Sequence, residues 1–179
     1  MLNACSKKSG FTLVEALVVV AIMGILSGLG VASLRGAVAN SRIKDAGINV
    51  TAYMERSANE ATRLNEKLCV VASGSTIKTY KAECSASKLG NPIDQMTLDV
   101  GSAFVTGKAC PDLTEKKTNA STQMTLTPKI GVSPIPPGCF MVRYGSTDKY
   151  AASIKSSKKF AMYYKLNYDG GAAGSWFEF

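Results

Sequence analysis

The N-terminal part of the sequence contains a charge-free apolar stretch that few folds can accommodate. No charged residue occurs from Ala16 to Leu34, and Lys7 and Lys8 precede this stretch. About 20 apolar residues are enough for a helix to cross a bilayer, and cations beside such a segment stay on the cytoplasmic side. We therefore expect residues 11–34 to form a membrane-spanning helix.

One carboxylate, Glu15, lies near the start of this apolar stretch. An unpaired carboxylate would cost several kcal/mol in lipid, so its presence indicates a functional role. Gly10 lies five residues earlier. Because Gly10 has no side chain, a protease can approach the backbone closely at the bond to Phe11.

The residues Lys7-Lys8-Ser9-Gly10-Phe11-Thr12-Leu13-Val14-Glu15, followed by apolar sequence to Leu34, resemble the class III signal of type IV pilins and type II secretion pseudopilins. In that family, a prepilin peptidase cuts after the glycine and methylates the new N-terminal residue. The resemblance implies cleavage between Gly10 and Phe11 and N-methylation of Phe11. It also implies that Glu15 pairs with the α-amine of a neighbouring subunit's Phe11 during filament assembly. Such a buried pair sets register more than it adds stability.

The resemblance also implies a location and partners. Residues 1–10 would be a cleaved leader, and residues 11–34 would serve as both membrane anchor and assembly helix. The head would lie in the periplasm of a bacterium, anchored in the inner membrane by a single pass, before the subunit joins a filament. The implied partners are the prepilin peptidase, other pilin or pseudopilin subunits and an inner-membrane assembly platform. Pilus and pseudopilus use the same signal, so both stay open, as do shaft and tip positions.

Two other interpretations of the N-terminus compete with this one. A signal anchor that never assembles also has cations before an apolar run, but it gives no reason for Glu15. A cleaved secretory signal could end at the small residues 37–39 and leave Asn40 as the first residue. However, the apolar run is too long for an ordinary signal peptide, and Arg35 lies between it and the cut.

Residues 35–67 show the periodicity of an amphipathic continuation of the same helix. The expected apolar stripe consists of Ile43, Gly47, Val50, Met54, Ala58, Ala61, Leu64 and Leu68. A helix from Phe11 to near Asn65 would be about 80 Å long at 1.5 Å per residue, and its second half should pack on a sheet. Glu55 and Glu60 have no cation at an ideal spacing, so we expect little from charge pairing on this helix.

Gly24 and Gly28 form a G-x-x-x-G pattern within the apolar stretch. This pattern allows two helices to approach closely in a membrane. Glycines also weaken a helix by about 1 kcal/mol each, which permits local bending.

Residues 68–179 are expected to form a mainly antiparallel β head, so the predicted fold class is α+β and pilin-like. Residues 68–72 and 76–80 flank a Ser-Gly-Ser turn, which predicts a hairpin. Further strands are expected at 96–100, 101–105, 124–129, 140–144 and 160–168. Residues 108–120 are typical of an exposed loop, and the proline-rich residues 133–138 of a stiff connector.

The helix end and the C-terminus narrow the resemblance. The residues Glu55-Arg56-Ser57-Ala58-Asn59-Glu60-Ala61, followed by an Asn-Glu-Lys turn and a Cys-Val-Val strand, resemble the GspH/FimT group of pseudopilins and minor pilins. Residues 166–171 followed by 176–179 resemble the closing Asp-Gly hairpin of that group. Members of the FimT type are linked to DNA uptake.

Four cysteines remain after the expected leader, which contains Cys5. An even number favours disulfides in an oxidising compartment. The four are Cys69, Cys84, Cys110 and Cys139. Of the possible pairings we favour the nearest neighbours, Cys69–Cys84 and Cys110–Cys139, because both loops are short. Without histidine or a C-x-x-C pair, we expect no zinc or other metal site.

The head offers little for catalysis. Without histidine, neither a Ser-His-Asp nor a Cys-His arrangement can be built. Two Ser-x-x-Lys spacings, at 85–88 and 156–159, are expected by chance in this composition and lack the accompanying motifs. We therefore expect no catalytic residues, no cofactor and no enzymatic activity.

A basic and aromatic segment is the best candidate for binding an acidic ligand. Four lysines alternate with aromatic residues between 155 and 168, namely Lys155, Lys158, Lys159 and Lys165. Cations beside flat rings suit a nucleic-acid or glycan surface, and DNA binding is the alternative function. The same alternation is expected of any half-exposed strand. The formal charge of +8, or +6 without Lys7 and Lys8, permits an acidic partner without requiring one.

Overall fold

The computed structural model describes residues 11–107, 119–128, 131–133, 138–145, 150–156, 160–166 and 177–178. From residue 150 onward only the backbone is described. The chain divides into two compact units, Met1–Val38 and Ala39–Phe179. The expected leader, with Lys7, Lys8 and Gly10, lies outside the described residues.

A single helix, α1, spans Leu13–Leu64, in agreement with the helix predicted from Phe11 to near Asn65. Thr12 caps its N-terminus, because the backbone N–H of Glu15 donates to Thr12 Oγ1 at 3.2 Å. Threonine followed three residues later by glutamate is the sequence of a capping box. The cap therefore gives Glu15 a local structural context in addition to its charge.

The C-terminus of α1 ends in a Schellman motif. The backbone N–H of Glu66 donates to the carbonyl of Ala61 and that of Asn65 to the carbonyl of Thr62, each at 3.2 Å. Asn65 adopts a positive φ of 52°, the left-handed conformation that this motif requires and that asparagine tolerates better than most residues. This turn directs the chain from α1 into the first strand.

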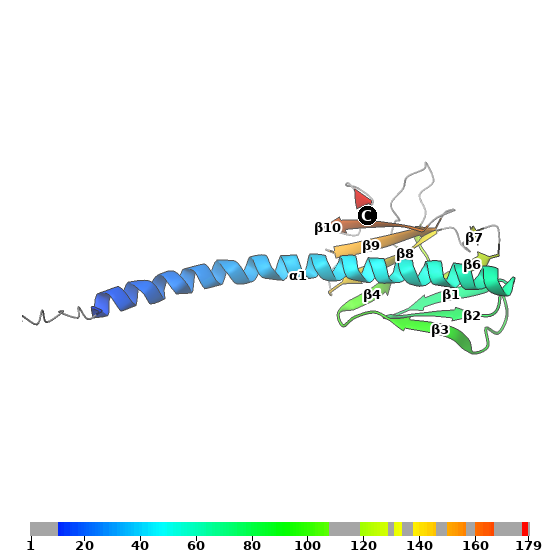
Figure 1. Cartoon of the computed structure of the whole chain (residues 1–179), viewed down its shortest axis with the longest axis horizontal. Helices are drawn as coiled ribbons and strands as arrows, with labels where there is room; N and C mark the ends of the chain where they lie inside the picture. Colours follow the sequence, from blue (N-terminus) through cyan, green and yellow to red (C-terminus); the bar gives the residue numbers. More distant parts are fainter. Residues whose placement is uncertain are drawn as a thin grey trace, which may run out of the picture. The chain divides into compact units, whose positions relative to one another are not determined.

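The strands of the described ranges form two sheets (Figure 1). The first has the order β3-β2-β1-β6-β7 and is antiparallel throughout. Its strands are β1 (Leu68–Ser73), β2 (Thr76–Tyr80), β3 (Pro92–Thr97), β6 (Gln123–Thr127) and β7 (Gly131–Ser133). The predicted hairpin of residues 68–80 is therefore confirmed as β1 and β2.

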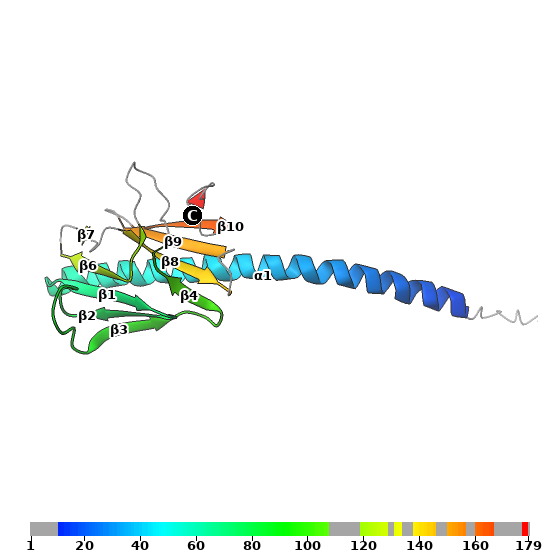
Figure 2. The ribbon, with the colours of Figure 1, turned by 180° about the vertical axis from the view of Figure 1, so that it is seen from behind.

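The second sheet has the order β11-β10-β9-β8-β4, and β5 pairs in parallel with β8 (Figure 2). Its strands are β4 (Ser102–Val105), β5 (Asn119–Ala120), β8 (Gly138–Tyr144), β9 (Tyr150–Ser156), β10 (Phe160–Leu166) and β11 (Phe177–Glu178). Predicted strands 101–105, 140–144 and 160–168 correspond to β4, β8 and β10.

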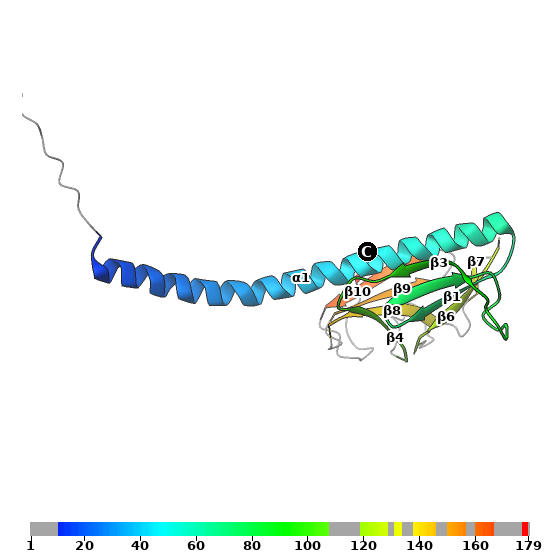
Figure 3. The ribbon, with the colours of Figure 1, turned by 90° about the horizontal axis from the view of Figure 1, so that it is seen from below.

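Within the second unit, the C-terminal part of α1 lies along the sheets (Figure 3). One apolar core joins the helix to both sheets. From α1 it takes Ile43, Ala46, Val50, Tyr53, Met54 and Ala61, and from the strands chiefly Leu68, Val70, Ala72, Ile77, Met124, Leu126, Phe140 and Val142. The predicted stripe thus packs on a sheet, with Ala58 and Leu64 only partly buried.

Three local predictions were wrong. The strand expected at residues 96–100 is β3 at Pro92–Thr97, because Asp99 to Gly101 turn the chain and Gly101 has a positive φ. The solvent-exposed edge position of β3 weakens its apolar pattern. The strand β9 was missed because its sequence has no clear strand pattern, and it forms by pairing with β8 and β10. The end of the loop expected at 108–120 forms β5; residues 108–118 and the connector residues 134–137 lie outside the described ranges.

Candidate functional site

The beginning of α1 presents the residues predicted for processing and assembly. Phe11 is 78% exposed, and Glu15 is exposed. Among the described residues, no side chain forms an ion pair or hydrogen bond with the Glu15 carboxylate. Glu15 is therefore available for a charged partner from outside this part of the chain.

The part of α1 that belongs to the first unit exposes many apolar side chains. The large ones between residues 11 and 34 are 40% to 81% exposed. They are Phe11, Leu13, Val14, Leu17, Val18, Val19, Val20, Ile22, Met23, Ile25, Leu26, Val31 and Leu34. Contiguous exposed apolar surface of this kind marks a surface that another molecule or a membrane covers. By length and hydropathy, no helix in the described part of the chain qualifies as a membrane span.

Gly24 and Gly28 lie within this apolar segment. A Cβ added to either glycine would meet no atom within 4 Å, apart from the neighbouring helical backbone. Packing within the described chain therefore does not require glycine at these positions. A close approach would have to involve a helix of another molecule, and the local-bending interpretation stays equally open.

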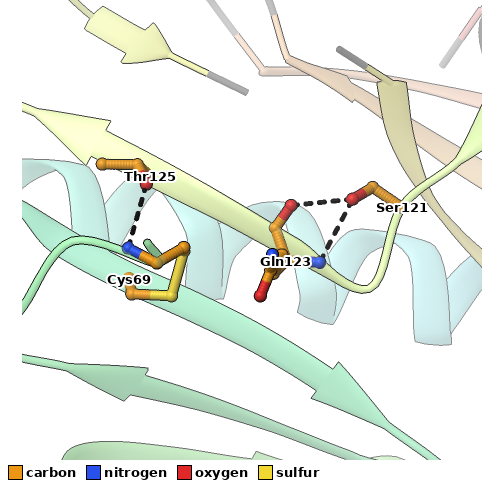
Figure 4. Close-up of a disulfide and its surroundings, with 5 residues drawn as sticks. Cys69, Ser121, Gln123 and Thr125 are labelled. Carbon is orange, nitrogen blue, oxygen red and sulfur yellow. Dashed lines mark hydrogen bonds between the residues drawn. A yellow bond between two sulfur atoms is a disulfide. The ribbon is translucent and has the colours of Figure 1, made fainter. Parts of the chain in front are cut away.

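A disulfide fastens the segment after β2 to the first sheet (Figure 4). It joins Cys69 of β1 to Cys84, with a Cα–Cα distance of 4.9 Å, which confirms the predicted pair. The backbone N–H of Cys84 also donates to Thr125 Oγ1 of β6 at 3.3 Å. Cys139 is disulfide-bonded as well, but Cys110 lies outside the described residues, so the pair Cys110–Cys139 stays a prediction.

A chain of buried hydroxyls connects α1 to the first sheet. Tyr53 Oη donates to the backbone carbonyl of Asp94 at 3.1 Å and lies 2.8 Å from Thr79 Oγ1. Ser57 Oγ lies 3.0 Å from the same Thr79 oxygen. Because each hydroxyl has one proton, Thr79 donates to Tyr53 and Ser57 donates to Thr79. Burial raises the pKa of Tyr53, and the hydrogen bond from Thr79 partly opposes this shift.

Ion pairs add to this attachment at its exposed margin. Arg56 contacts the Asp94 carboxylate at 2.5 Å and lies 5.4 Å from the centre of the Tyr53 ring. Arg42 pairs with Asp99 at 3.2 Å. A cavity of about 250 Å³ beside Arg56 is also lined by Ser57, Glu60, Thr79, Ile93 and Asp94.

One expectation about α1 was wrong. Glu60 and Arg63 form a two-point contact, with Arg63 Nε and Nη2 donating to the two carboxylate oxygens at 2.7 and 2.5 Å. These hydrogen bonds lower the pKa of the Glu60 carboxyl. The sequence spacing of three residues permits this contact in a helix.

Only two of the four candidate lysines, Lys155 and Lys165, lie in the described residues. Lys158 and Lys159 lie outside the described residues. Lys155 is in register with Cys139 and Ala161, and Lys165 with Ala151. The register places both lysines on the sheet face opposite the Phe140 and Val142 positions, which belong to the core. Cys139 and Met141 of β8 lie on that same face and are themselves buried.

Metal and catalytic sites have no support in the described residues. Within these ranges, no group of three or more His, Cys, Asp or Glu residues could hold a metal ion. The ion pairs at Arg42 and Arg56 connect α1 to residues 94 and 99, and that at Arg63 lies within α1.

Comparison with known proteins identifies the N-terminal segment. Residues 5–31 match the sequence family described as the prokaryotic N-terminal methylation motif. The chain carries this methylation motif. It begins before the expected cleavage site and includes Gly10, Phe11 and Glu15. The methylation motif implies processing by a prepilin peptidase.

Two crystal structures of the type IV minor pilin FimU from Pseudomonas aeruginosa strain PAO1 are similar to this chain. The structure in space group P21 is 15% identical, with a TM-score of 0.45, over 75% of this chain and 95% of that chain. The structure in space group P65 is 16% identical, with a TM-score of 0.44, over 74% and 98%. No curated protein matches this chain. The similarity to the two FimU structures, at these identities and TM-scores, assigns no function to this chain.

Proposed function

We propose that this protein is a structural subunit, of minor abundance, of a type IV pilus or type II secretion pseudopilus. The observation that carries this proposal is the methylation motif at residues 5–31. The motif overlaps the first turns of α1, whose large apolar side chains are exposed between Phe11 and Leu34. Burial of such a surface is worth about 25 cal/mol per Å². In a filament, neighbouring α1 helices bury this surface.

In this proposal, the prepilin peptidase cuts between Gly10 and Phe11 and methylates the new α-amine. The new amine then lies close in sequence to the α1 cap formed by Thr12 and Glu15. The exposed Glu15 carboxylate pairs with the α-amine of a neighbouring subunit and sets the axial register of the helices. The absence of a Glu15 partner among the described residues supports this assignment.

Before assembly, residues 11–34 hold the protein at the inner membrane with the head in the periplasm. This step rests on the methylation motif. A disulfide at Cys69–Cys84 agrees with an oxidising compartment such as the periplasm. Membership of the GspH/FimT group is the finer form of the proposal, and it rests on residues 55–61 and the strand that follows.

The decisive experiment measures the mass and N-terminal residue of the mature protein from cells with and without prepilin peptidase. We expect an N-methylated Phe11 only when the peptidase is present. A mature protein that begins at Asn40 would identify a secreted protein, and an uncut leader would identify a simple anchor. Either result would overturn the proposal.

A second experiment separates assembly from anchoring. Glu15→Ala should leave cleavage and membrane association intact but reduce incorporation into filaments, measured by shear fractionation. Glu55→Ala, which removes a carboxylate from an exposed α1 position outside the apolar stretch, is the matched control and should incorporate normally. Equal incorporation of Glu15→Ala and the native chain would favour an anchored monomer.

The DNA-binding alternative has no specific structural support, because its lysines are described only in part. It remains testable by titrating duplex DNA into the full chain at several salt concentrations. Phosphate contacts would make affinity fall steeply with salt, whereas undetectable or salt-independent binding would exclude this alternative.

A further inference from the structure

The outer face of the β1–β2 hairpin contains a cavity that the proposed function does not use. Alternate residues of a strand point to opposite faces. Val70, Ala72 and Ile77 enter the core shared with α1. The residues between them line a cavity of about 310 Å³ on the other face, namely Val71, Ser73, Thr76, Lys78 and Tyr80.

Four of the five lining side chains are polar, and their hydrogen-bonding capacity is unused. Within the described ranges, Ser73, Thr76, Lys78 and Tyr80 make no side-chain hydrogen bond and no ion pair. Lys78 and Tyr80 are nevertheless half-buried. The cavity therefore gathers one ammonium group and three hydroxyl groups, all of which can donate hydrogen bonds.

Among the described residues, no carboxylate lines this cavity. Lys78 is in register with Gln95 of β3, and Val71 with Gln123 of β6, so neutral amides flank it on both sides. Asp94 is in register with Thr79; its carboxylate pairs with Arg56 of α1 and accepts from the backbone N–H of Gln95. The nearby Lys81 and Lys67 are already paired with Glu66 and Glu83. The described lining of the cavity therefore carries one positive charge, that of Lys78.

We propose that this cavity binds the phosphate group of a small phosphate ester, such as a sugar phosphate. Charge-assisted hydrogen bonds from a lysine to phosphate oxygens are among the stronger polar contacts, and the hydroxyls of Ser73, Thr76 and Tyr80 supply further donors. The volume is near the lower end of the range for small-ligand cavities, about 300–1,000 Å³. It accommodates more than a bare phosphate.

The competing explanation is a solvated face of an antiparallel sheet, on which serine, threonine and lysine are common. That explanation predicts exposed, independent side chains. Here the lysine and the tyrosine are half-buried around one shared cavity. Because this face lies opposite the core contacts of the hairpin, burial of α1 in a filament would leave it accessible.

The test is an NMR titration of the full chain in detergent micelles with inorganic phosphate, glucose 6-phosphate and glucose. We expect both phosphates to shift the amide signals of Lys78 and Tyr80, with a Kd on the order of 1 mM, and glucose to leave them unchanged. Binding of glucose as tight as that of glucose 6-phosphate would overturn the proposal. So would the absence of shifts at about 50 mM phosphate, far above that Kd.

Three variants separate this site from general surface charge. Lys78→Gln should weaken phosphate binding by about tenfold or more, as expected for loss of a charge-assisted hydrogen bond. Tyr80→Phe keeps the charge and the ring, and should weaken binding by about threefold. Lys88→Gln removes the same charge from an exposed lysine and should leave binding unchanged. If Lys88→Gln and Lys78→Gln weaken binding equally, or if neither Lys78→Gln nor Tyr80→Phe weakens it, the cavity is not the site.

Discussion

The Tyr53 hydroxyl of α1 lies 2.8 Å from the Thr79 hydroxyl of β2, and both residues are buried. This contact joins α1 to the first sheet of the head. Tyr53 Oη also donates to the Asp94 carbonyl of the edge strand β3. One side chain therefore connects three elements.

Loss of the Tyr53 hydroxyl should destabilise the head. Tyr53→Phe leaves the Asp94 carbonyl and the Thr79 hydroxyl without their partner, which should cost about 1–3 kcal/mol. Urea unfolding of the full chain in micelles measures this loss. Tyr144→Phe is the matched control, since Tyr144 packs against the core without a side-chain hydrogen bond among the described residues. If both variants lose a similar free energy of unfolding, the effect does not come from the hydrogen bonds of Tyr53.

The pKa of Tyr53 predicts how stability changes at alkaline pH. Burial raises this pKa above the ordinary value of 10.0, so the folded state holds the proton more tightly than the unfolded state. The resulting stability is fully present below pH 10.0 and is lost as pH rises through the raised pKa. Unfolding free energies from pH 8 upward should therefore fall more steeply for the native chain than for Tyr53→Phe. Parallel curves would contradict the shift.

Removal of the Cys69–Cys84 disulfide should destabilise the head while the fold persists. The bridged residues are 15 apart in sequence, and closing a loop of that length stabilises a protein by about 3 kcal/mol. The double variant Cys69→Ala/Cys84→Ala should show this loss in urea unfolding. The single variant Cys69→Ala should lose a comparable amount, because either change breaks the bond. An unchanged unfolding midpoint would show that the loop is already constrained by its other contacts.

The turn at Asn65 should be sensitive to side-chain shape. Asn65→Val places a β-branched residue at a φ of 52°, which should cost about 1–2 kcal/mol. Asn65→Gly keeps the turn without a Cβ and should be neutral or slightly stabilising. Thermal unfolding compares the two variants. Equal melting temperatures would mean that the Schellman turn contributes little to stability.

The glycines of α1 can be tested in the monomer and in the filament. Gly24→Ala and Gly28→Ala should each strengthen the helix by about 1 kcal/mol in micelles, because an added Cβ meets nothing there. If the glycines allow close approach of neighbouring helices, both variants should lower filament yield in sheared fractions. Ala37→Gly is the reverse control, because it adds a glycine to α1 beyond Arg35, outside the apolar stretch. If both alanine variants give a normal filament yield, assembly requires neither close helix packing nor a bend at these glycines.

Much of α1 and its processing signal follows from local sequence. The charge-free stretch from Ala16 to Leu34 and the three-to-four spacing after it predict one long helix, and Gly10, Phe11 and Glu15 fall within the matched methylation motif. The Cys69–Cys84 bridge was also predictable, because it closes a short loop. These features depend on residues that are close in sequence, so periodicity and spacing carry the information.

Only the tertiary structure decides the contacts between distant segments. Tyr53 was not in the predicted stripe, yet it is buried because β2 and β3 supply Thr79 and the Asp94 carbonyl. The strand β9 has small residues and depends on pairing with β8 and β10. The cavity at Lys78 exists because adjacent strands bring alternate residues to one face. Sequence periodicity predicted most of the residues of α1 that turn inward but not Tyr53, whereas strand register determined which residues meet, because register is set by pairing between distant segments.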